Sequence, residues 1–454
     1  MFREAGSHGF ASSRSLTPRP QTTDALLSMD DSGSRMPLED LVDDGSVRIT
    51  GFVSAGDGVG RTSEGRVVFV EGGIPGERVE LIDVRTHKKV LRARAGKIIE
   101  AGSDRVEPRC PHFGICGGCR WQHVRYSAQL DAKRQIIFDA LKRIGGISLS
   151  EEIRIVPSPD PYAYRARARW VEFGGTLGFR VRGSKSVSPV EVCPVLVGSA
   201  EAALKERVAE SEEAGLRVED AARRGKRQRV KEWVVTAGSE GKALVSPSLA
   251  GRSARGRRQT PGSVLIEVGD ESLRASGESF LQGNALLWEA LAKAVRAECM
   301  SGLEDVASTH FAELYAGIGF FTLGLAREFA GGVALESDRS ALADLKFNLR
   351  RANLDDRVDV LAGRVETRGD LTARIASGRV LLVDPPRIGL APALREAIAA
   401  GGPERIVYVS CDPATLARDL RELGSIGYEV ATIRAFDLFP QTPHVESIVR
   451  LERS

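Results

Sequence analysis

The sequence predicts a multidomain α/β protein whose C-terminal part folds as a doubly wound sheet. Three observations support this prediction. Strand-like and helix-like segments alternate after residue 285, short strands separated by glycines fill residues 47–102, and a group of cysteines lies between these two regions. A chain of 454 residues is also too long for one ordinary hydrophobic core, so two or three domains are expected.

The overall composition is that of a soluble globular protein, with 42% hydrophobic and 28% charged residues. Because 64 basic and 61 acidic residues leave a net charge of only +3, any nucleic-acid surface must come from local clustering. The sequence has no apolar run long enough for a membrane span and no secretory apolar core at its start. We therefore expect a cytoplasmic protein without a membrane partner, in which grouped cysteines indicate metal binding or catalysis.

Residues 1–45 are rich in Ser, Thr, Pro and acidic residues without periodicity, and are predicted to form a disordered tail. Met29 and Met36 are alternative translation starts to Met1, a hypothesis that N-terminal sequencing of the native protein would test.

A small β-barrel is predicted for residues 46–104. Several short strands separated by glycine turns in this length suggest a Greek-key barrel of the oligonucleotide-binding type, although a barrel without a ligand fits the pattern equally well. The strand candidates are residues 47–53, 65–70, 78–84 and 90–99.

The central region, residues 105–276, begins with the cysteine group. Cys110, Cys116 and Cys119, together with the distant Cys193, supply four thiolates, enough for tetrahedral zinc or for a four-iron cluster. A cysteine pair two residues apart suits zinc, whereas the glycines beside it leave backbone amides free to donate to cluster sulfurs. Spacing alone therefore leaves both metals open. Residues 122–144 then have the pattern of an amphipathic helix that ends at two glycines.

Basic side chains follow two patterns in the central region. In residues 162–170, arginines alternate with alanines, so a strand would place Arg165, Arg167 and Arg169 on one face. Arg180, Arg182 and Lys185 follow at similar spacing. Two further basic stretches, residues 223–229 and 252–258, are expected to be loose and have no assigned role.

Residues 277–454 are predicted to form the doubly wound sheet, after a helix at 285–299. The last two strands leave no room for a helix between them, so an antiparallel hairpin is expected at the sheet edge. A sheet with this edge is typical of class I methyltransferases. The strand candidates are residues 310–315, 332–336, 358–361, 380–383, 405–410, 428–436 and 444–451.

A glycine turn follows the first of these strands. Gly317 and Gly319 come just after Tyr315, and glycines there let backbone amides approach a ligand closely. The spacing differs from the dinucleotide fingerprint, because Thr322 replaces its third glycine. Glu336 ends the second strand, where a carboxylate can accept ribose hydroxyls. The glycines alone fit a plain tight turn equally well, but with Glu336 and the hairpin edge they favour S-adenosylmethionine.

Cys411 is the candidate nucleophile. It ends the fifth strand, Asp412 is a good N-cap and Pro413 suits the first helical position, so a helix over 414–423 is expected. The positive end of that helix favours a thiolate, whereas Asp412 opposes it. A lone cysteine on a strand is more often a small buried hydrophobe, but its place at the cofactor edge favours catalysis.

Two carboxylates complete the candidate site. Asp384 follows the fourth strand in a loop that two prolines stiffen; its simpler role is a turn or helix cap. Glu446 begins the last strand among apolar neighbours, where a raised pKa would suit a base, although read alone it fits a surface residue. A thiolate, a base and a methyl donor together match methylation of uracil carbon 5. The thiolate adds to carbon 6, carbon 5 takes the methyl group, and the base removes the carbon 5 proton.

At this point residues 46–454 resemble the RNA 5-methyluridine (uracil-C5) methyltransferase family, in particular its ribosomal-RNA branch with a TRAM domain and an iron–sulfur cluster. The matching segments are Pro75-Gly76-Glu77-Arg78-Val79, Cys116-Gly117-Gly118-Cys119 followed by Gln122-His123, Phe280-Leu281-Gln282-Gly283-Asn284, Asp384-Pro385-Pro386-Arg387, Ser410-Cys411-Asp412-Pro413 and His444-Val445-Glu446.

The resemblance implies that Cys411 is the nucleophile and Glu446 the base. It implies that the barrel is an RNA-holding TRAM domain, and that the four cysteines bind a [4Fe–4S] cluster, with zinc as the alternative. Such a cluster would have a structural or RNA-positioning role, because no step needs an electron. The residues expected to contact S-adenosylmethionine are Gln282, Tyr315, Glu336 and Asp384.

The chain departs from the family at two positions. Ala316 stands where many members have Cys, and Phe320 stands where some members have a polar residue that contacts the cofactor. The cluster and the barrel favour 23S ribosomal RNA over transfer RNA as substrate. With an RNA-modifying domain beside them, the two arginine stripes favour phosphate contacts. Single-stranded RNA with a flipped uridine is expected, because stacking shields carbons 5 and 6.

Two other classes of protein remain as alternatives. A radical S-adenosylmethionine methylthiotransferase would show C-x3-C-x2-C on a barrel fold, whereas this chain has five residues between its first two cysteines. A non-catalytic RNA-binding assembly factor would leave Cys411 inert. No obligate protein partner is evident from the sequence.

Overall fold

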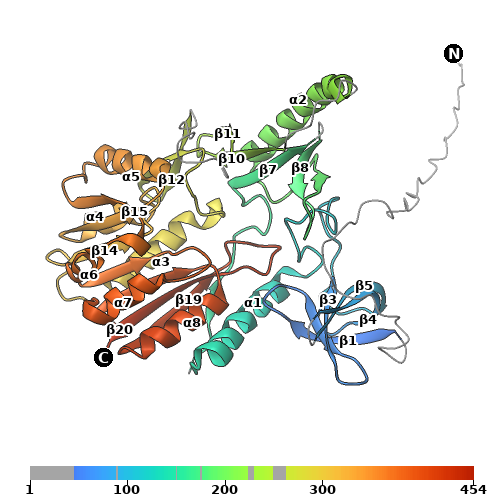
Figure 1. The fold of residues 1–454 in the computed structure, drawn as a ribbon, viewed down its shortest axis with the longest axis horizontal. Helices are drawn as coiled ribbons and strands as arrows, with labels where there is room; N and C mark the ends of the chain where they lie inside the picture. Colours follow the sequence, from blue (N-terminus) through green and yellow to red (C-terminus); the bar gives the residue numbers. More distant parts are fainter. Residues whose placement is uncertain (1–44, 88–89, 150, 174–175, 223–229, 249–261) are drawn as a thin grey trace, which may run out of the picture. The chain divides into compact units, whose positions relative to one another are not determined.

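A computed structural model describes residues 45–87, 90–149, 151–173, 176–222, 230–248 and 262–454 (Figure 1). These residues all belong to one compact unit. The predictions for the N-terminal tail, for Met29 and Met36 and for the basic stretches at 223–229 and 252–258 lie outside the described residues, apart from residue 45. Among the described residues, no helix is both long and apolar enough to cross a membrane.

The N-terminal barrel is confirmed. Its five strands close in the order β1-β2-β3-β5-β4. A parallel pair joins β3 to β5, and an antiparallel pair between β1 and β4 closes the barrel. Alternate residues such as Val68 and Val70 point inward and are fully buried, as a half-buried strand requires. The strands are β1 (Ser46–Phe52), β2 (Gly58–Arg61), β3 (Val67–Glu71), β4 (Arg78–His87) and β5 (Val90–Glu100).

Helix α1 (Tyr126–Ala140) follows the cysteine segment and continues as a π-helical turn, η2 (Leu141–Gly145). The predicted stop is correct, because Gly146 adopts a left-handed conformation with φ 67°. The predicted start at residue 122 is wrong by four residues. Val124 instead pairs with Arg105 in an isolated β-bridge, which holds this segment extended until Tyr126.

The rest of the central region forms a five-stranded antiparallel sheet in the order β11-β10-β7-β8-β9, against which the long helix α2 packs. A two-stranded hairpin, β12-β13, leads to the C-terminal part. The elements are β7 (Arg167–Phe173), β8 (Thr176–Arg180), β9 (Val187–Pro189), α2 (Gly198–Ala222), β10 (Lys231–Ala237), β11 (Ala243–Pro247), β12 (Ser263–Val268) and β13 (Glu271–Ser276).

The C-terminal sheet has eight strands in the order β16-β15-β14-β17-β18-β20-β19-β6. Strands β14 to β18 are parallel, and β20 runs antiparallel between β18 and β19, as the predicted hairpin requires. The strands are β14 (His310–Leu314), β15 (Gly331–Glu336), β16 (Val358–Ala362), β17 (Val380–Val383), β18 (Arg405–Ser410), β19 (Tyr428–Phe436) and β20 (Glu446–Arg453).

The outer edge differs from the prediction, because a central-region strand covers part of it. Strand β6 (Arg154–Val156) pairs in parallel with the end of β19, from Arg434 to Phe436. The hairpin is therefore next to the edge rather than at it. This pairing also brings the chain just after α1 beside the end of β19.

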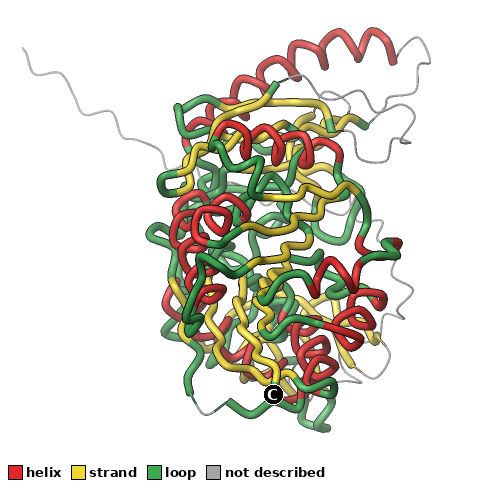
Figure 2. The backbone as a smooth tube through the Cα atoms, turned by 90° about the vertical axis from the view of Figure 1, so that its left-hand side faces the viewer, coloured by secondary structure: helices red, strands yellow, loops and turns green. Residues whose placement is uncertain are grey.

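Both faces of the sheet are covered by helices, and Figure 2 shows helices on either side of its strands. Along β17, Val380 and Leu382 belong to one buried cluster, whereas Leu381 and Val383 belong to another. This explains why the central strands have continuous apolar sequences. The helical elements are η4 (Ala285–Leu287), α3 (Trp288–Met300), α4 (Thr322–Glu328), α5 (Arg339–Arg351), η5 (Val365–Thr367), α6 (Leu371–Ala376), α7 (Pro392–Gly401) and α8 (Pro413–Gly424).

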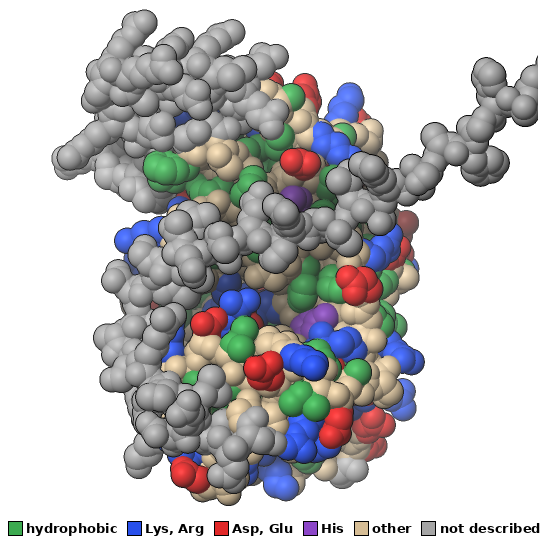
Figure 3. All heavy atoms as spheres, turned by 90° about the vertical axis from the view of Figure 1, so that its right-hand side faces the viewer, with side chains coloured by type: hydrophobic (Ala, Val, Ile, Leu, Met, Phe, Trp, Pro, Cys, Tyr) green, Lys and Arg blue, Asp and Glu red, His purple; other side chains and the backbone are tan. Residues whose placement is uncertain are grey.

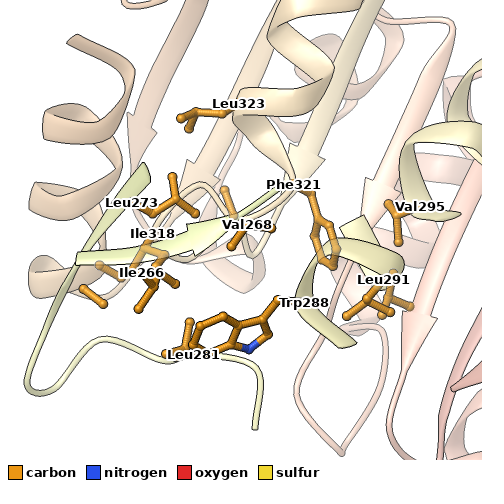
Figure 4. Packing of buried hydrophobic residues seen from close by; sticks show 14 of the residues in the cluster. Ile266, Val268, Leu273, Leu281, Trp288, Leu291, Val295, Ile318, Phe321 and Leu323 are labelled. Carbon is orange, nitrogen blue, oxygen red and sulfur yellow. The ribbon is translucent and has the colours of Figure 1, made fainter. Parts of the chain in front are cut away.

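The β12-β13 hairpin supports the glycine turn from below. Figure 4 shows Ile266 and Leu273 of the hairpin beside Ile318, which lies between the two glycines of the turn. All three side chains are buried. The turn therefore rests on a packed apolar layer, with Trp288 and Phe321 in the same cluster.

Candidate active site

The glycine turn after β14 has the strained backbone that its sequence predicts. Tyr315, Gly317 and Gly319 all have positive φ, of 65°, 59° and 92°. A Cβ atom on Gly319 would lie 2.8 Å from Leu345 Cδ1, so both backbone and space require glycine there. A Cβ atom on Gly317 would meet nothing within 4 Å, so that side of the turn is open.

Glu336, at the end of β15, holds this turn. Its Oε2 accepts a hydrogen bond from the Gly317 amide at 2.8 Å, and its Oε1 accepts from the amides of Ser337 and Asp338 at 2.6 Å. The predicted carboxylate and the predicted glycines are thus brought together. An amide–carboxylate contact of this kind fixes the side chain in one orientation.

Gln282 and Asp384 also meet, although they are far apart in the sequence. Gln282 Nε2 donates to Asp384 Oδ2 at 3.0 Å, and the Gln282 side chain is buried. Burial raises the pKa of Asp384, and the hydrogen bond from Gln282 opposes this shift.

Sequence reasoning missed a third carboxyl group here, Glu313 on β14. Burial, followed by the nearby Asp384 and Glu336, raises its pKa to about 8, and the neighbouring Thr322 hydroxyl opposes this shift. Its Oε2 is buried without a hydrogen-bond partner among the described residues. A buried polar atom left without a partner is costly, so Glu313 marks a place where a ligand would contribute a contact. An acidic residue at the end of a buried strand was the available sequence signal.

Cys411 and Glu446 are neighbours across two strands. Ser410 at the end of β18 pairs with Ser447 of β20, so the residues next to them, Cys411 and Glu446, lie side by side. Burial and then the Glu446 carboxylate raise the pKa of Cys411 to about 12. Burial and then Asp384 raise the pKa of Glu446 above its ordinary value. The predicted nucleophile, base and loop carboxylate therefore form one group.

Arg387 is the positive charge in this group. It lowers the pKa of Glu446, and it lowers the pKa of Cys411 both by its charge and by a hydrogen bond to the thiol. Its Nη2 lies 3.4 Å from His444 Nε2. Burial and Arg387 lower the pKa of His444 to about 4, so this imidazole is neutral at pH 7. Both residues stand in the matching segments quoted above, but no role was assigned to them.

The predicted helix start beside Cys411 is confirmed. Asp412 is the N-cap of α8, with its side chain accepting from the Thr415 amide at 2.9 Å, and Pro413 opens the helix. The net shift of the Cys411 pKa is nevertheless upward. Burial and a neighbouring carboxylate outweigh the charge and the hydrogen bond of Arg387.

The four central cysteines line one cavity of about 310 Å³, together with His112 and Gln122. Each is partly buried, and burial raises the pKa of Cys119 to about 11 and that of Cys193 to about 12. Within the described ranges, no three His, Cys, Asp or Glu side chains are grouped tightly enough to hold a single metal ion.

The same cavity extends toward the active site. Arg387 and His444 line it, as do Phe439 and Thr442 from the loop before Glu446. Arg165 and Arg169 of the first arginine stripe line it as well. The cysteine segment and the group around Cys411 therefore line one cavity. Neither sequence motif alone predicted this.

The alternation in the first arginine stripe is confirmed, since Ala166 and Ala168 are buried and the arginines between them are not. The strand itself begins later than predicted, at Arg167, because Ala163 has a φ of 46°. Arg169 and Arg180 both contact Glu232, at 3.5 and 2.9 Å.

Arginines of the second stripe, which comprises Arg180, Arg182 and Lys185, also form ion pairs. Arg182 pairs with Asp57 of the barrel at 3.0 Å. On the face drawn in Figure 3, Lys and Arg side chains lie among acidic ones rather than forming an unbroken basic surface. These arginines therefore already have partners on the protein, which the sequence pattern did not reveal.

Comparisons with known proteins identify related RNA methyltransferases. Residues 369–454 match the family model described as tRNA (Uracil-5-)-methyltransferase, and residues 46–95 match the TRAM domain. A 23S rRNA (uracil(1939)-C(5))-methyltransferase RlmD from Azoarcus sp. is 34% identical over 432 residues, which cover 88% of this chain and 97% of the relative. An uncharacterized RNA methyltransferase from Streptomyces avermitilis is 32% identical, over 89% of this chain and 97% of the relative.

Among solved structures, the tRNA (uracil-54, C5)-methyltransferase of Pyrococcus abyssi, in complex with S-adenosyl-L-homocysteine, has the same fold. It superimposes with a TM-score of 0.67 at 24% sequence identity, covering 89% of this chain and 100% of that chain.

Proposed function

We propose that this chain, which belongs to the RNA uracil-C5-methyltransferase family, methylates carbon 5 of a uridine in 23S ribosomal RNA. The observation that carries the proposal is the pair of Cys411 and Glu446 at the ends of adjacent strands, with Arg387 close enough to lower the pKa of both. Two relatives named for 23S rRNA, at 34% and 31% identity over most of both chains, favour ribosomal over transfer RNA.

The catalytic residues act on the uracil ring in two steps. The Cys411 thiol ionises and its Sγ adds to carbon 6, which moves the C5–C6 electron pair onto carbon 5 and makes it nucleophilic. Once carbon 5 has gained a methyl group, the Glu446 carboxylate takes the proton from carbon 5. The double bond then re-forms and the Sγ–C6 bond breaks, which returns the thiolate. A base with a raised pKa suits this step, because its strength is closer to that needed near pH 7.

S-adenosylmethionine is the expected methyl donor, and when bound it supplies the electrophilic methyl group. The residues that would hold it are Gln282, Tyr315, Gly317, Gly319, Glu336 and Asp384. Three observations support the fit: open space at Gly317, the partnerless Oε2 of Glu313, and the carboxylates of Glu313, Glu336 and Asp384 around the turn. A site rich in carboxyl groups that accept hydrogen bonds suits a ligand with ribose hydroxyls and a sulfonium centre.

A [4Fe–4S] cluster is the metal group that we assign to Cys110, Cys116, Cys119 and Cys193. All four thiols line one cavity, as the ligands of a shared cluster must. The Gly118 amide donates to Cys116 Sγ at 3.4 Å, a contact of the kind that stabilises cluster thiolates. Anaerobically purified protein should contain iron and sulfide and absorb broadly in the visible range. Protein with stoichiometric zinc and no iron would overturn this assignment.

Two experiments test the methyltransferase proposal. RNA containing 5-fluorouridine should form an adduct with the protein that survives denaturation, because fluorine at carbon 5 cannot leave as a proton. The Cys411→Ala variant should form none. Mapping 5-methyluridine in ribosomal and transfer RNA from a deletion strain then identifies the substrate. Loss of the methyl group from transfer RNA alone would overturn the ribosomal assignment, and no loss from either RNA would overturn the activity.

A further inference from the structure

The loop that joins β19 to β20, residues 437–445, ends directly at the base. Its two flanking residues, Phe436 and Glu446, are a register pair of the sheet. The loop also carries His444, which contacts Arg387. The sheet register brings Glu446 next to Cys411, and the path of this loop determines how the chain enters Glu446 and where the Arg387 contact lies.

Helix α1 holds the start of the loop through a fully buried lysine. Lys133 forms an ion pair with Asp437, and both side chains have no exposed surface. Lys133 Nζ also donates to the Phe439 carbonyl at 3.0 Å. A lysine is almost never buried unless it is paired, because removing its charge from water is costly. Both polar partners of the buried Lys133, Asp437 and the Phe439 carbonyl, belong to this one loop.

The same helix holds the middle of the loop through Gln129. The Gln129 Oε1 accepts from the Gln441 amide at 2.9 Å, and Gln129 Nε2 donates to Gln441 Oε1 at 3.0 Å. Gln441 has a φ of 66°, a backbone conformation that residues other than glycine rarely adopt. Such a residue persists only where its surroundings determine its backbone, which these two hydrogen bonds do.

Gln441 is also fastened to the cysteine segment. Its carbonyl accepts hydrogen bonds from the amides of Arg120 and Trp121, both at 2.9 Å, one and two residues after Cys119. Gln129 Nε2 donates to the Trp121 carbonyl at 3.0 Å, so helix, cysteine segment and loop meet at Gln441.

We propose that Lys133 and Gln129 are positioning residues that place Glu446 for removal of the carbon 5 proton. This inference rests on the proposed function, because it takes Glu446 as the base. The two residues hold the loop at Asp437, Phe439 and Gln441, several positions before the base, and so act through the loop rather than on the substrate. Cys411 directly follows β18, so its position in space is set by that strand rather than by this loop.

The test is a Lys133→Met substitution, read out by the methylated adduct that forms with ordinary uridine RNA and S-adenosylmethionine. Misplacing the base slows only the last step, so the denaturation-resistant adduct should accumulate, as it should in a Glu446→Gln variant. We expect roughly 10–100-fold slower release of product RNA, the size of effect that a displacement of about 1 Å produces. Adduct formation with 5-fluorouridine RNA should stay close to that of the unsubstituted protein.

The matched control is Lys142→Met, which removes an exposed lysine from the π-helical turn that continues the same helix. It should accumulate no adduct. If Lys133→Met yields no folded protein, Gln129→Glu applies the same test, because it removes the donor to Gln441 and keeps the acceptor for its amide.

The outcomes separate this inference from the proposed function. Adduct accumulation in both the Glu446→Gln and the folded α1 variant supports positioning. Accumulation in Glu446→Gln alone overturns it, and so does an equal loss of every step with a lowered melting temperature. Absence of any adduct in the unsubstituted protein with 5-fluorouridine RNA would instead defeat the proposed function.

Discussion

At the scale of single residues, two neighbours have opposite effects on the pKa of Cys411, the proposed nucleophile. Burial and Glu446 raise the pKa of Cys411 to about 12, and Arg387 opposes them. At pH 7 the thiol is therefore protonated in the free protein, and only a small fraction is ready to add to a pyrimidine. Arg387 is the described residue whose charge and hydrogen bond favour the reactive form.

The first prediction follows from the sign of that shift. Because the pKa lies well above neutrality, the thiolate fraction grows about tenfold for each pH unit from 7 to 9. Adduct formation with 5-fluorouridine RNA should rise accordingly over this range. An Arg387→Met variant should form the adduct roughly 10–100-fold more slowly at pH 7, since it loses both favourable effects.

Rates of adduct formation under single-turnover conditions check this prediction. Arg364→Met, at a surface side chain that is 72% exposed, is the control and should behave as the unsubstituted protein. A rate that does not change between pH 7 and 9 would mean that the thiol is already ionised.

The glycine turn gives a second prediction at this scale. Gly319→Ala places a Cβ atom 2.8 Å from Leu345 and 2.9 Å from Leu323, at a φ of 92°. We expect a loss of about 1–3 kcal/mol in stability and a weaker affinity for S-adenosylhomocysteine. Gly369→Ala is the matched control, because a Cβ atom there meets nothing within 4 Å. Thermal unfolding and calorimetric titration measure both effects; equal behaviour of the two variants would refute the strain.

At the scale of elements, the sequence predicts what local pattern determines. The bounds of β17, β18 and β19 coincide with the predicted ones. Strands β17 and β18 are buried on both faces and need unbroken apolar runs, whereas β19 is partly exposed. Pattern fails where a distant partner decides. The start of α1 is delayed by the pairing of Val124 with Arg105, and β6 exists because β19 offers it an edge.

The same limit applies to the site. Cys411, Asp384 and Glu446 stand at strand ends, where the alternation of strands and helices shows that ligands bind. Arg387 and Lys133 act through contacts with residues that are distant in sequence, His444 and Asp437. Nothing in the spacing of an arginine in a loop or a lysine in a helix distinguishes these two from surface residues. Their roles became visible only once the fold was known.

The buried pair between α1 and the β19–β20 loop yields the third prediction. Lys133→Met leaves the Asp437 carboxylate buried without its partner and should cost about 3–5 kcal/mol of unfolding free energy. The double variant Lys133→Met, Asp437→Leu removes both charges and should recover most of that loss. Denaturant unfolding of Lys133→Met, of Asp437→Leu and of the double variant measures the coupling energy between the two side chains. Additive losses would show that the pair contributes no mutual interaction.

At the scale of the whole molecule, the barrel and the active-site loop are in direct contact. Gly56 in the barrel has a φ of 88°, and a Cβ atom there would lie 2.8 Å from Pro443, three residues before the base. Its carbonyl accepts from Trp121 Nε1 at 2.9 Å, and the neighbouring Asp57 pairs with Arg120. The barrel, the cysteine segment and the loop that carries the proposed base thus meet in one place, which would bring RNA bound to the barrel close to that loop.

The fourth prediction concerns how the barrel contributes to RNA binding. Arg92 and Lys97 are exposed on β5, away from the contact with the loop. If they meet phosphates, the double variant Arg92→Ala, Lys97→Ala should bind RNA more weakly. Its plot of log affinity against log salt should flatten by ~0.7 for each phosphate of single-stranded RNA that the variant no longer neutralises. The rate at saturating RNA should not change, because neither residue contacts the catalytic group. Lys293→Ala on α3, an exposed lysine paired with Glu289, is the control. An unchanged salt slope would place the RNA on another face of the barrel.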